Sequence, residues 1–504
     1  MKSAVIIGGG LGGLFTGAIL AKEGIRVAVL EKNATPGGGL QSFSRWGETF
    51  DTGMHIIAGM RPGGCVRRLC DYLGLRADIA DIDGNCADRL YFAEDSRVYE
   101  LPSGRDAFTE SLAHEFPAER KGIADYVEAI HRLADEVPLL KLRRSESFVN
   151  IHSSEFTMAA DAFIAQYVGD RRLRAILAYT NPLYGGCGGM TPAYVHAIIS
   201  VLYLQGQSRF AGGSVRFANE LVRVIRENGG DVRVADVVTD IQVSDRNVTL
   251  VRTASGREYH ADYYISAIHP CALLPLVRGG GLTPAYRRRL NSLPVSYSAF
   301  SLYLKFRKGA FPYIPCSEYF MTRYDDIWRF NQRHRQWPLG FLFMTPPSLR
   351  QEASASTGLV TAPMLWEETA RWAETSWRHR GPDYAAWKEE RIADILRCLE
   401  KMHPGIGNAI DSIEGASPLT IRDFYGSKEG CISGFSKDCN NIAMSQVPVV
   451  TKVRNLFLTG QNNNLHGFCG VPLTAILTAE AILGQNYIID RLNEEDLSKS
   501  SIVR

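Results

Sequence analysis

The chain has 504 residues, of which 45% are hydrophobic and 22% charged, so its composition excludes a disordered or fibrous protein. Lys and Arg total 56 against 54 Asp and Glu, and this net charge of +2 argues against a protein that binds nucleic acid by neutralising phosphates. Ten cysteines in 504 residues are too few for a disulfide scaffold, and the absence of any C-x-x-C spacing argues against a zinc site. We therefore expect reduced thiols in a cytoplasmic protein and no metal centre.

The N-terminal residues predict a strand, a helix and a second strand in succession. An apolar strand covers residues 4–7, helical periodicity covers 14–22, and a second apolar strand covers 26–30. Gly24 ends the helix at a position where glycine tolerates a positive φ. This apolar start imitates a secretory signal, but it contains six glycines and no A-x-A cleavage site follows it. We interpret it as one βαβ unit.

A glycine pattern joins the first strand to the helix. Gly8, Gly10 and Gly13 fit G-x-G-x-x-G, in which the glycines allow a tight turn, close backbone approach to a pyrophosphate, and close helix–strand packing. Glu31 ends the second strand, where a carboxylate accepts hydrogen bonds from ribose hydroxyls and repels a 2′-phosphate. The unit predicts a dinucleotide site that disfavours NADP. No second such pattern follows a strand, so we expect no built-in nicotinamide domain.

A similar alternation of elements returns later in the chain. We expect a helix over 214–227, strands over 232–238, 239–251 and 257–268, a strand over 455–459 and a helix over 472–483. Residues 105–180 are predicted to be mostly helical. Residues 295–345 hold 14 aromatics and contain an alternating strand pattern, which favours either the core of a half-buried sheet or the wall of a pocket for a long apolar ligand.

These elements predict one nucleotide-binding domain built from separated segments, with a second domain inserted between them. The predicted boundaries are 1–75, 206–290 and 412–490 for the first domain, 76–205 and 291–411 for the second, and 491–504 for a loose polar tail.

Three segments carry a resemblance to a known family. Gly47-x-x-Phe50-Asp51-x-Gly53-x-His55 follows the first βαβ unit, and the blocks 212–267 and 455–480 come later. Together they resemble the superfamily of FAD-dependent phytoene desaturases, carotenoid isomerases and retinol saturases (all-trans-retinol 13,14-reductases), which shares its flavin fold with the amine oxidases. The spacing is more similar to the retinol saturase and carotenoid isomerase branch than to the desaturases proper.

The resemblance implies an α/β fold. Its Rossmann-type FAD-binding domain would be of the glutathione reductase and amine oxidase kind, formed from discontinuous segments, with an inserted α+β substrate domain. The residues that the resemblance and the glycine pattern place at FAD are Gly8, Gly10, Leu11, Gly12, Gly13, Glu31, Lys32, Gly38, Gly39, Leu40, His55, Val238, Gly460, Gln461, Gly470, Val471, Pro472 and Leu473.

The last of these segments also has a physical interpretation of its own. The strand that ends at Thr459-Gly460 places backbone N–H groups beside a phosphate or ribityl chain. Pro472 is favoured in the first turn of a helix, so we expect a helix to begin there and to direct its positive N-terminal end into the cleft. In flavoenzymes this end stabilises negative charge on the reduced ring. Gln461 stands where many flavoproteins carry an acid, and it can still bond ribityl hydroxyls.

Four residues are candidates for the chemistry. His55 and His466 lie inside the flavin-like segments and could transfer a proton, although a histidine that only bonds flavin or backbone is the favoured interpretation. Tyr184 is a candidate proton donor on a loop that resembles the family's substrate-side segment, with a loop anchor as its alternative. Cys469 could be a reactive thiol, but a buried inert cysteine is favoured. Ser433 replaces a tyrosine that is common in the family, which weakens a substrate contact there.

The sequence therefore predicts an FAD-dependent oxidoreductase that acts on C=C bonds of a polyene or isoprenoid-like lipid by hydride transfer. Saturation, desaturation and isomerisation are all compatible with it. The alternatives are an amine oxidase-like or steroid- or quinone-directed flavoenzyme, and a non-catalytic prenyl-lipid carrier of the GDP-dissociation-inhibitor type. The expected partners are a hydrophobic small molecule and a docking electron donor or acceptor. No run reaches about 18 apolar residues, so no spanning helix is expected, whereas peripheral membrane contact stays open.

Overall fold

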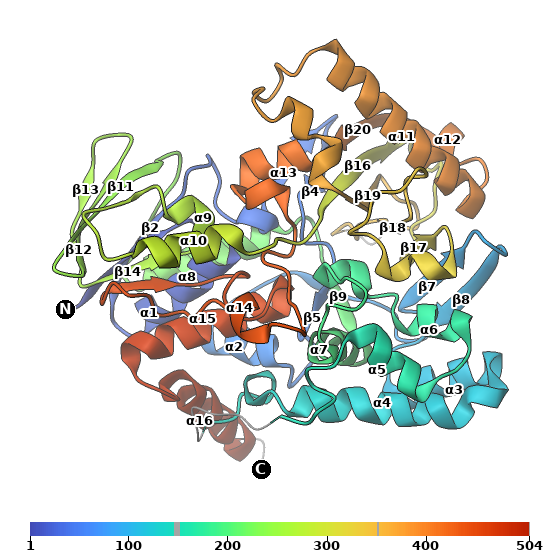
Figure 1. Ribbon diagram of the computed structural model, residues 1–504, viewed down its shortest axis with the longest axis horizontal. Coiled ribbons are helices and arrows are strands. Elements are labelled where there is room, and N and C mark those ends of the chain that lie inside the picture. Colours follow the sequence, from blue (N-terminus) through green and yellow to red (C-terminus); the bar gives the residue numbers. More distant parts are fainter. Residues whose placement is uncertain (146–151, 350–351, 503–504) are drawn as a thin grey trace.

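The computed structural model describes residues 1–145, 152–349 and 352–502. Two sheets organise the chain (Figure 1): a five-stranded sheet in the order β10-β2-β1-β14-β21 and a seven-stranded sheet in the order β20-β16-β19-β18-β17-β7-β8. The first lies at the left of the view and the second at the upper right, above a group of helices. The architecture is the predicted α/β fold, in which a Rossmann-type domain carries a second, α+β part.

The five-stranded sheet is parallel throughout, and its strands come from three distant parts of the chain. Four of the five residues of β1 are buried, as expected for a strand with both faces covered. On the face formed by Ala4 and Ile6, α1 packs against α8 and α15. The elements are β1 (Ser3–Ile7), α1 (Leu11–Lys22), β2 (Arg26–Leu30), α8 (Val215–Glu227), β10 (Asp231–Arg233), β14 (Tyr263–Ser266), β21 (Leu456–Leu458) and α15 (Gly467–Leu483).

A four-stranded sheet, in the order β13-β12-β11-β15, shares its core with the opposite face of β1. The predicted strand over 232–238 is wrong in its extent, because β10 ends at Arg233 and β11 begins only at Val238. Between them Ala235 has a φ of +53° and the Asp236 N–H bonds the Glu31 carbonyl, so the chain turns from one sheet into the other. The elements are β11 (Val238–Ser244), β12 (Asn247–Thr253), β13 (Glu258–Tyr259), α9 (Pro270–Leu273), β15 (Val277–Arg278) and α10 (Pro284–Ser292).

The seven-stranded sheet contains the predicted aromatic strand, β16. Phe300 on one face packs on Trp387 of α11, whereas Tyr303 on the other packs on Phe43, so β16 is buried on both faces. The predicted boundary at residue 412 falls inside β20. The elements are β7 (Asp88–Phe92), β8 (Arg97–Leu101), β16 (Ser298–Phe306), β17 (Ser317–Met321), β18 (Gly340–Met344), β19 (Thr357–Met364), α11 (Pro382–Met402), α12 (Ile406–Ala409), β20 (Ile410–Ala416) and α13 (Pro418–Tyr425).

Helices fill the lower right of Figure 1, as the predicted helical character of 105–180 requires. α7 is central, and all but one of its residues are buried. Two small sheets, β3-β4 and β5-β9-β6, lie in the segments that connect the two large sheets. The elements are β3 (Ser42–Arg45), β4 (Glu48–Asp51), β5 (Ile57–Ala58), α2 (Cys65–Leu73), β6 (Ile79–Asp81), α3 (Arg105–Glu115), α4 (Arg120–Asp135), α5 (Ala160–Tyr167), α6 (Arg171–Leu177), α7 (Ala193–Leu204), β9 (Gln207–Phe210) and α14 (Ile442–Ser445).

The C-terminal segment differs from the prediction in two ways. α15 begins at Gly467, so Pro472 lies inside the helix rather than in its first turn. The predicted tail over 491–504 begins inside α16 (Tyr487–Ile502), which buries Ile488, Ile489 and Leu492 against the core; 503–504 lie outside the described residues. Among the described helices none is long and apolar enough to cross a membrane alone; only α15 and the start of α16, bent by 114°, pass that test together.

Candidate functional site

The glycine turn before α1 is where backbones from separate segments meet. A Cβ on Gly13 would lie 2.0 Å from the Gly8 carbonyl oxygen, and one on Gly12 would lie 2.9 Å from the Cα of Gly460. Gly8 also has a φ of +102°, which residues with a Cβ atom rarely adopt. The turn can therefore be this tight, with the end of β21 packed directly on α1, only because these positions are glycine.

Glu31 is held rigidly at the end of β2. Its side chain is buried, one carboxylate oxygen accepts a hydrogen bond from Gly9 N–H at 2.8 Å, and the other accepts one from Asn33 N–H at 2.8 Å. The acid therefore stands directly beside the glycine turn, as the sequence pattern requires. The neighbouring Lys32 points elsewhere, since its ammonium donates to the Asp423 carbonyl at 2.8 Å.

A third segment completes the same region. Gly37 and Gly10 form a parallel bridge, and the short 3-10 turn of Gly38–Leu40 follows directly. Leu40 is fully buried, whereas a Cβ on Gly39 would come within 4 Å only of the Tyr425 hydroxyl and Met54. Val238 begins β11, and its side chain packs in the core behind the parallel sheet.

Two helices begin in this region without a side-chain cap. The N-cap of α1 is Gly10, which has no side chain to cap the helix, and the side chain of His466, the N-cap of α15, does not bond the first turn. The first N–H groups of a helix have no intrahelical acceptor and carry the positive end of the helix dipole. Together with the glycine-lined backbone, they form a cradle whose chemistry fits the pyrophosphate of a dinucleotide.

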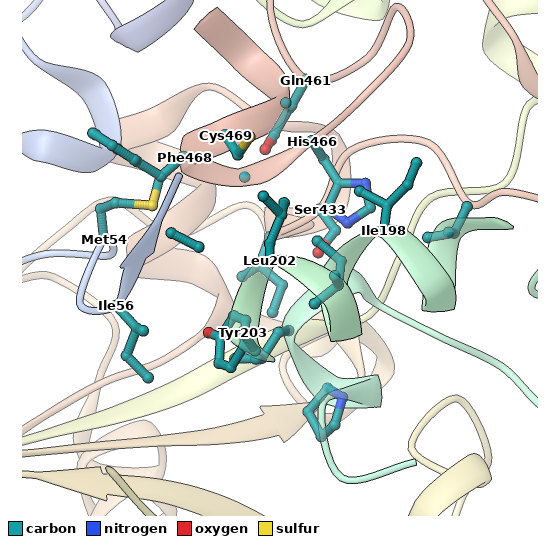
Figure 2. A pocket seen from close by; sticks show the side chains of 18 of the residues that line it. Met54, Ile56, Ile198, Leu202, Tyr203, Ser433, Gln461, His466, Phe468 and Cys469 are labelled. Carbon is teal, nitrogen blue, oxygen red and sulfur yellow. The ribbon is translucent and has the colours of Figure 1, made fainter. Parts of the chain in front are cut away.

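Beyond this cradle lies a cavity of about 210 Å³, which we call the main cavity. One wall carries Gln461, His466, Phe468 and Cys469 from the loop after β21 and the start of α15, and Figure 2 shows them opposite Leu202 of α7. Other walls come from the seven-stranded sheet and from the segment after β4. Most lining groups are apolar; they include Met54, Ile56, Leu183, Val195, Ile198, Ile199, Tyr203, Tyr319, Met321, Phe341, Leu342 and Ile432.

Two neutral histidines line the main cavity. Burial, and next the nearby Lys437 ammonium, lowers the pKa of His466 to about 3, and burial also lowers the pKa of His55. The Nδ1 atom of His55 and the Nε2 atom of His466 are buried and have no hydrogen-bond partner among the described residues. Buried ring nitrogens seldom remain unpaired, so both are suited to bond a ligand in the cavity.

Tyr184 does not reach the main cavity. Its hydroxyl lies 3.0 Å from Nδ1 of His196, whose Nε2 lies 2.7 Å from the Tyr126 hydroxyl, in a fully buried chain. The predicted loop does line the cavity, but through Pro182 and Leu183. This position favours the loop-anchor interpretation of Tyr184, because its hydroxyl bonds within the helical layer.

Lys437 is the residue that the sequence analysis missed. It lies in an irregular segment between β20 and β21, lines the main cavity and donates to the Ser445 carbonyl at 3.3 Å. Burial lowers the pKa of its ammonium to about 8. It is the only Lys, Arg, Asp or Glu among the described residues that line this cavity. No periodicity or motif marks it, so only the fold reveals its position.

The cradle, the uncapped helices and the adjoining apolar cavity fit an enzyme that binds a dinucleotide cofactor beside an apolar ligand. The profile of the flavin containing amine oxidoreductases matches residues 11–483, and the chain belongs to this family. The predicted cofactor, FAD, is thereby confirmed, as is the predicted class of enzyme. The role of each individual residue at FAD stays a prediction.

Relatives and solved structures agree with this assignment. The chain is 25% identical to human all-trans-retinol 13,14-reductase over 97% of its own length and 87% of the relative. It is 22% identical to the chloroplastic prolycopene isomerase of Arabidopsis thaliana, over 85% and 74% of the two chains. The crystal structure of an oxidoreductase from Methanosarcina mazei has the same fold, with a TM-score of 0.65, 17% identity, and coverage of 95% and 100%. The predicted resemblance is confirmed.

Proposed function

We propose that this flavoenzyme acts on C=C bonds of a polyene or isoprenoid-like lipid. The observation that carries the proposal is the main cavity, whose apolar walls from α7 and the seven-stranded sheet face the start of α15. Apolar pockets with few polar groups suit long hydrophobic ligands. The names of the relatives, which act on retinol and prolycopene, support the same class of substrate.

In this proposal FAD supplies hydride chemistry, and the chain supplies position and charge. Gly10 and Gly12 admit the pyrophosphate, and Glu31 holds the ribose. The neutral rings of His55 and His466 bond the ligand or the flavin through their unpaired nitrogens. The Lys437 ammonium can stabilise negative charge in the cavity or give a proton from Nζ, which saturation requires after hydride transfer.

The amine oxidase alternative is less favoured. The substrate of such an enzyme presents an amino group that is protonated in water, and a carboxylate would stabilise that charge. Among the described residues that line the main cavity there is no Asp or Glu, and the single charged group is the cation Lys437. The surroundings therefore repel an ammonium group.

A direct assay tests the proposal. The holoenzyme is kept without oxygen and incubated in its reduced form with retinol, carotenoids or a steroid, and in its oxidised form with a diamine. The flavin spectrum is recorded, and the masses of the products are measured by mass spectrometry. We expect a polyene to gain two hydrogens, or to keep its mass and change its retention if the reaction is isomerisation. Reoxidation by the steroid alone, or flavin reduction by the diamine with every polyene unchanged, would overturn the proposal.

We also propose a peripheral contact with membranes in the cytoplasm, because lipid substrates reside there. The three consecutive arginines at 287–289 give this little support. Arg287 donates to the Val277 carbonyl at 2.9 Å and Arg289 to the Gln446 carbonyl at 2.7 Å, so both bind backbone groups of the protein. Cosedimentation with anionic vesicles tests the contact, and an unchanged supernatant fraction would count against it.

A further inference from the structure

Two cysteines that are far apart in the sequence meet beside the main cavity. The Sγ atoms of Cys65 and Cys469 lie 3.3 Å apart, and each residue is only 6% exposed. Cys65 is the first residue of α2, and Cys469 lies in the first turn of α15. A positive helix end therefore adjoins each sulfur, and such an end favours a thiolate.

The pair lies in the wall between two cavities. Cys469 lines the main cavity, and Cys65 lines a second cavity of about 360 Å³, which we call the side cavity. Leu140, Ile198 and Leu202 line both cavities and so form the same partition. Each thiol thus faces a different compartment, while the two sulfurs touch each other through the wall.

The two thiols also differ in acidity. The hydrogen bond from Cys469 lowers the pKa of Cys65, and the N–H groups at the start of α2 and the Arg68 guanidinium add to this effect. The same contact, together with burial, raises the pKa of Cys469 well above the usual range for a thiol. Because Cys65 lines the side cavity, it is the sulfur that a reductant in that cavity reaches, and the arrangement is that of a dithiol rather than of two inert core residues.

We propose that Cys65 and Cys469 form a reversible dithiol–disulfide couple, which carries two electrons from a dithiol reductant in the side cavity to the flavin at the main cavity. The inference rests on the flavin assignment and not on the polyene substrate. Movement of the sulfurs by about 1.2 Å would bring them to the S–S bond length of about 2.05 Å.

The reaction balances in two stages. In the first, a thiolate of the reductant attacks Cys65 of the disulfide and Cys469 leaves as a thiolate, which takes a proton. The second thiol of the reductant then releases Cys65, so the reductant becomes a disulfide and the pair becomes a dithiol. In the second stage the S–S bond of Cys65 and Cys469 forms again and the pair gives up two electrons and two protons. Oxidised FAD, when bound, would accept the two electrons and one proton, and the other proton goes to solvent.

Thiol counting tests the couple without any lipid substrate. The full-length holoenzyme is equilibrated with oxidised or reduced dithiothreitol, and its free thiols are alkylated. The masses of the intact protein and of its peptides are then measured by mass spectrometry. We expect the oxidised sample to lose two alkylated thiols and to contain one disulfide that joins the peptides of Cys65 and Cys469. Cys65→Ala and Cys469→Ala should each abolish that disulfide. Cys70→Ala, a change at a buried cysteine of the same helix α2, should leave it intact.

A second readout follows electron transfer. Without oxygen, reduced dithiothreitol should bleach the flavin of the wild type and of Cys70→Ala about tenfold faster than that of Cys65→Ala or Cys469→Ala, since thiol exchange needs both cysteines of the couple. The inference would be overturned if the thiols of Cys65 and Cys469 both stayed free throughout the redox range, or if the flavin bleached at equal rates in all four proteins. Failure of polyene conversion with an intact disulfide signal would contradict only the proposed function.

Discussion

Lys437 and His466 both line the main cavity, and the charge of Lys437 affects the protonation of His466. The ammonium lowers the pKa of the imidazole, and burial lowers the pKa of both groups, to about 8 for Lys437 and about 3 for His466. At neutral pH the pair therefore carries one positive charge, located on Lys437. His466 remains neutral over the whole range in which most enzymes work and contributes no ionisation there.

Lys437→Met should lower turnover at pH 7 by about tenfold, because it removes the charge or the proton that the cavity supplies. In the wild type this contribution is present below pH 8 and is lost as the pH rises through 8, where Lys437 gives up its proton. The variant should lose that step in its pH–rate profile. Lys437→Arg, whose charge persists above pH 12, should also lack the step while retaining more activity. A step near pH 8 that survives in Lys437→Met would contradict this role.

The glycine pattern permits a sharper test, since its members have different tasks. A Cβ on Gly10 meets no protein atom closer than 3.8 Å, whereas one on Gly13 would lie 2.0 Å from the Gly8 carbonyl. Gly10→Ala should therefore keep the thermal stability of the apoprotein and lose FAD affinity. Gly13→Ala should lower the melting temperature itself. Calorimetry and flavin absorbance measure the two effects, and equal losses in both variants would contradict the distinction.

The sequence analysis was most successful where a few neighbouring residues define a geometry. The glycine turn and Glu31 lie in contact as predicted, since their spacing is local and the βαβ unit has one favoured shape. Lys437 and the pair of Cys65 and Cys469 were beyond its reach. Their positions depend on how segments about 400 residues apart pack together, and no short-range pattern records such packing.

At the scale of the element, the start of α15 shows how a single preference misleads. Proline is common in first turns, so Pro472 predicted the helix start, but α15 already begins at Gly467. The missing N–H of Pro472 leaves the carbonyl four residues earlier, that of Phe468, without its helical donor. The break in the helical hydrogen bonds thus falls at the start of α15, where His466, Phe468 and Cys469 line the main cavity.

Asp88 of β7 is an acid buried between two sheets. The Tyr179 hydroxyl donates to it at 2.7 Å and the Gln207 amide of β9 also donates to it, yet burial raises its pKa to about 7. The folded protein thus binds this proton more tightly than the unfolded chain does. The resulting stabilisation is complete below about pH 4, the ordinary range of Asp, and is lost as the pH rises to 7.

Asp88→Asn should therefore stabilise the protein by about 1–3 kcal/mol at pH 8 and change it little at pH 4, because the amide needs no charge. Thermal or urea unfolding at the two pH values measures the difference. A difference in stability that is equal at both pH values would show that the carboxyl is not the titrating group.

At the scale of the whole molecule, the main cavity exists because α7, the seven-stranded sheet and the start of α15 come together. The sequence predicted the parallel sheet and its three segments well, since buried parallel strands are short continuous apolar runs. It predicted an apolar ligand from the aromatic content of 295–345. It could not assign individual walls, because α7 is apolar on every side and its pattern does not distinguish core from cavity.

Ile199 of α7 lines the main cavity but not the side cavity, so it separates ligand binding from the cysteine pair. Ile199→Trp should fill the cavity and raise KM for a long polyene by about tenfold or more, since a bulky indole excludes the chain. FAD content and the thiol count should not change. Ile199→Ala, which enlarges the same space, should accept bulkier polyenes. An unchanged KM in the tryptophan variant would show that the substrate binds elsewhere.

The assembly of the parallel sheet from three distant segments also has a consequence for synthesis on the ribosome. β14 ends at Ser266, but its neighbour β21 begins only at Leu456. At about 5–20 residues per second the nascent chain waits roughly ten to forty seconds with one edge of β14 unpaired. Throughout that interval FAD has no complete cradle, because Gly460 is not yet made. The emerging chain therefore exposes this strand edge for most of its synthesis, and the cofactor can stabilise the fold only from the last seconds of translation onward.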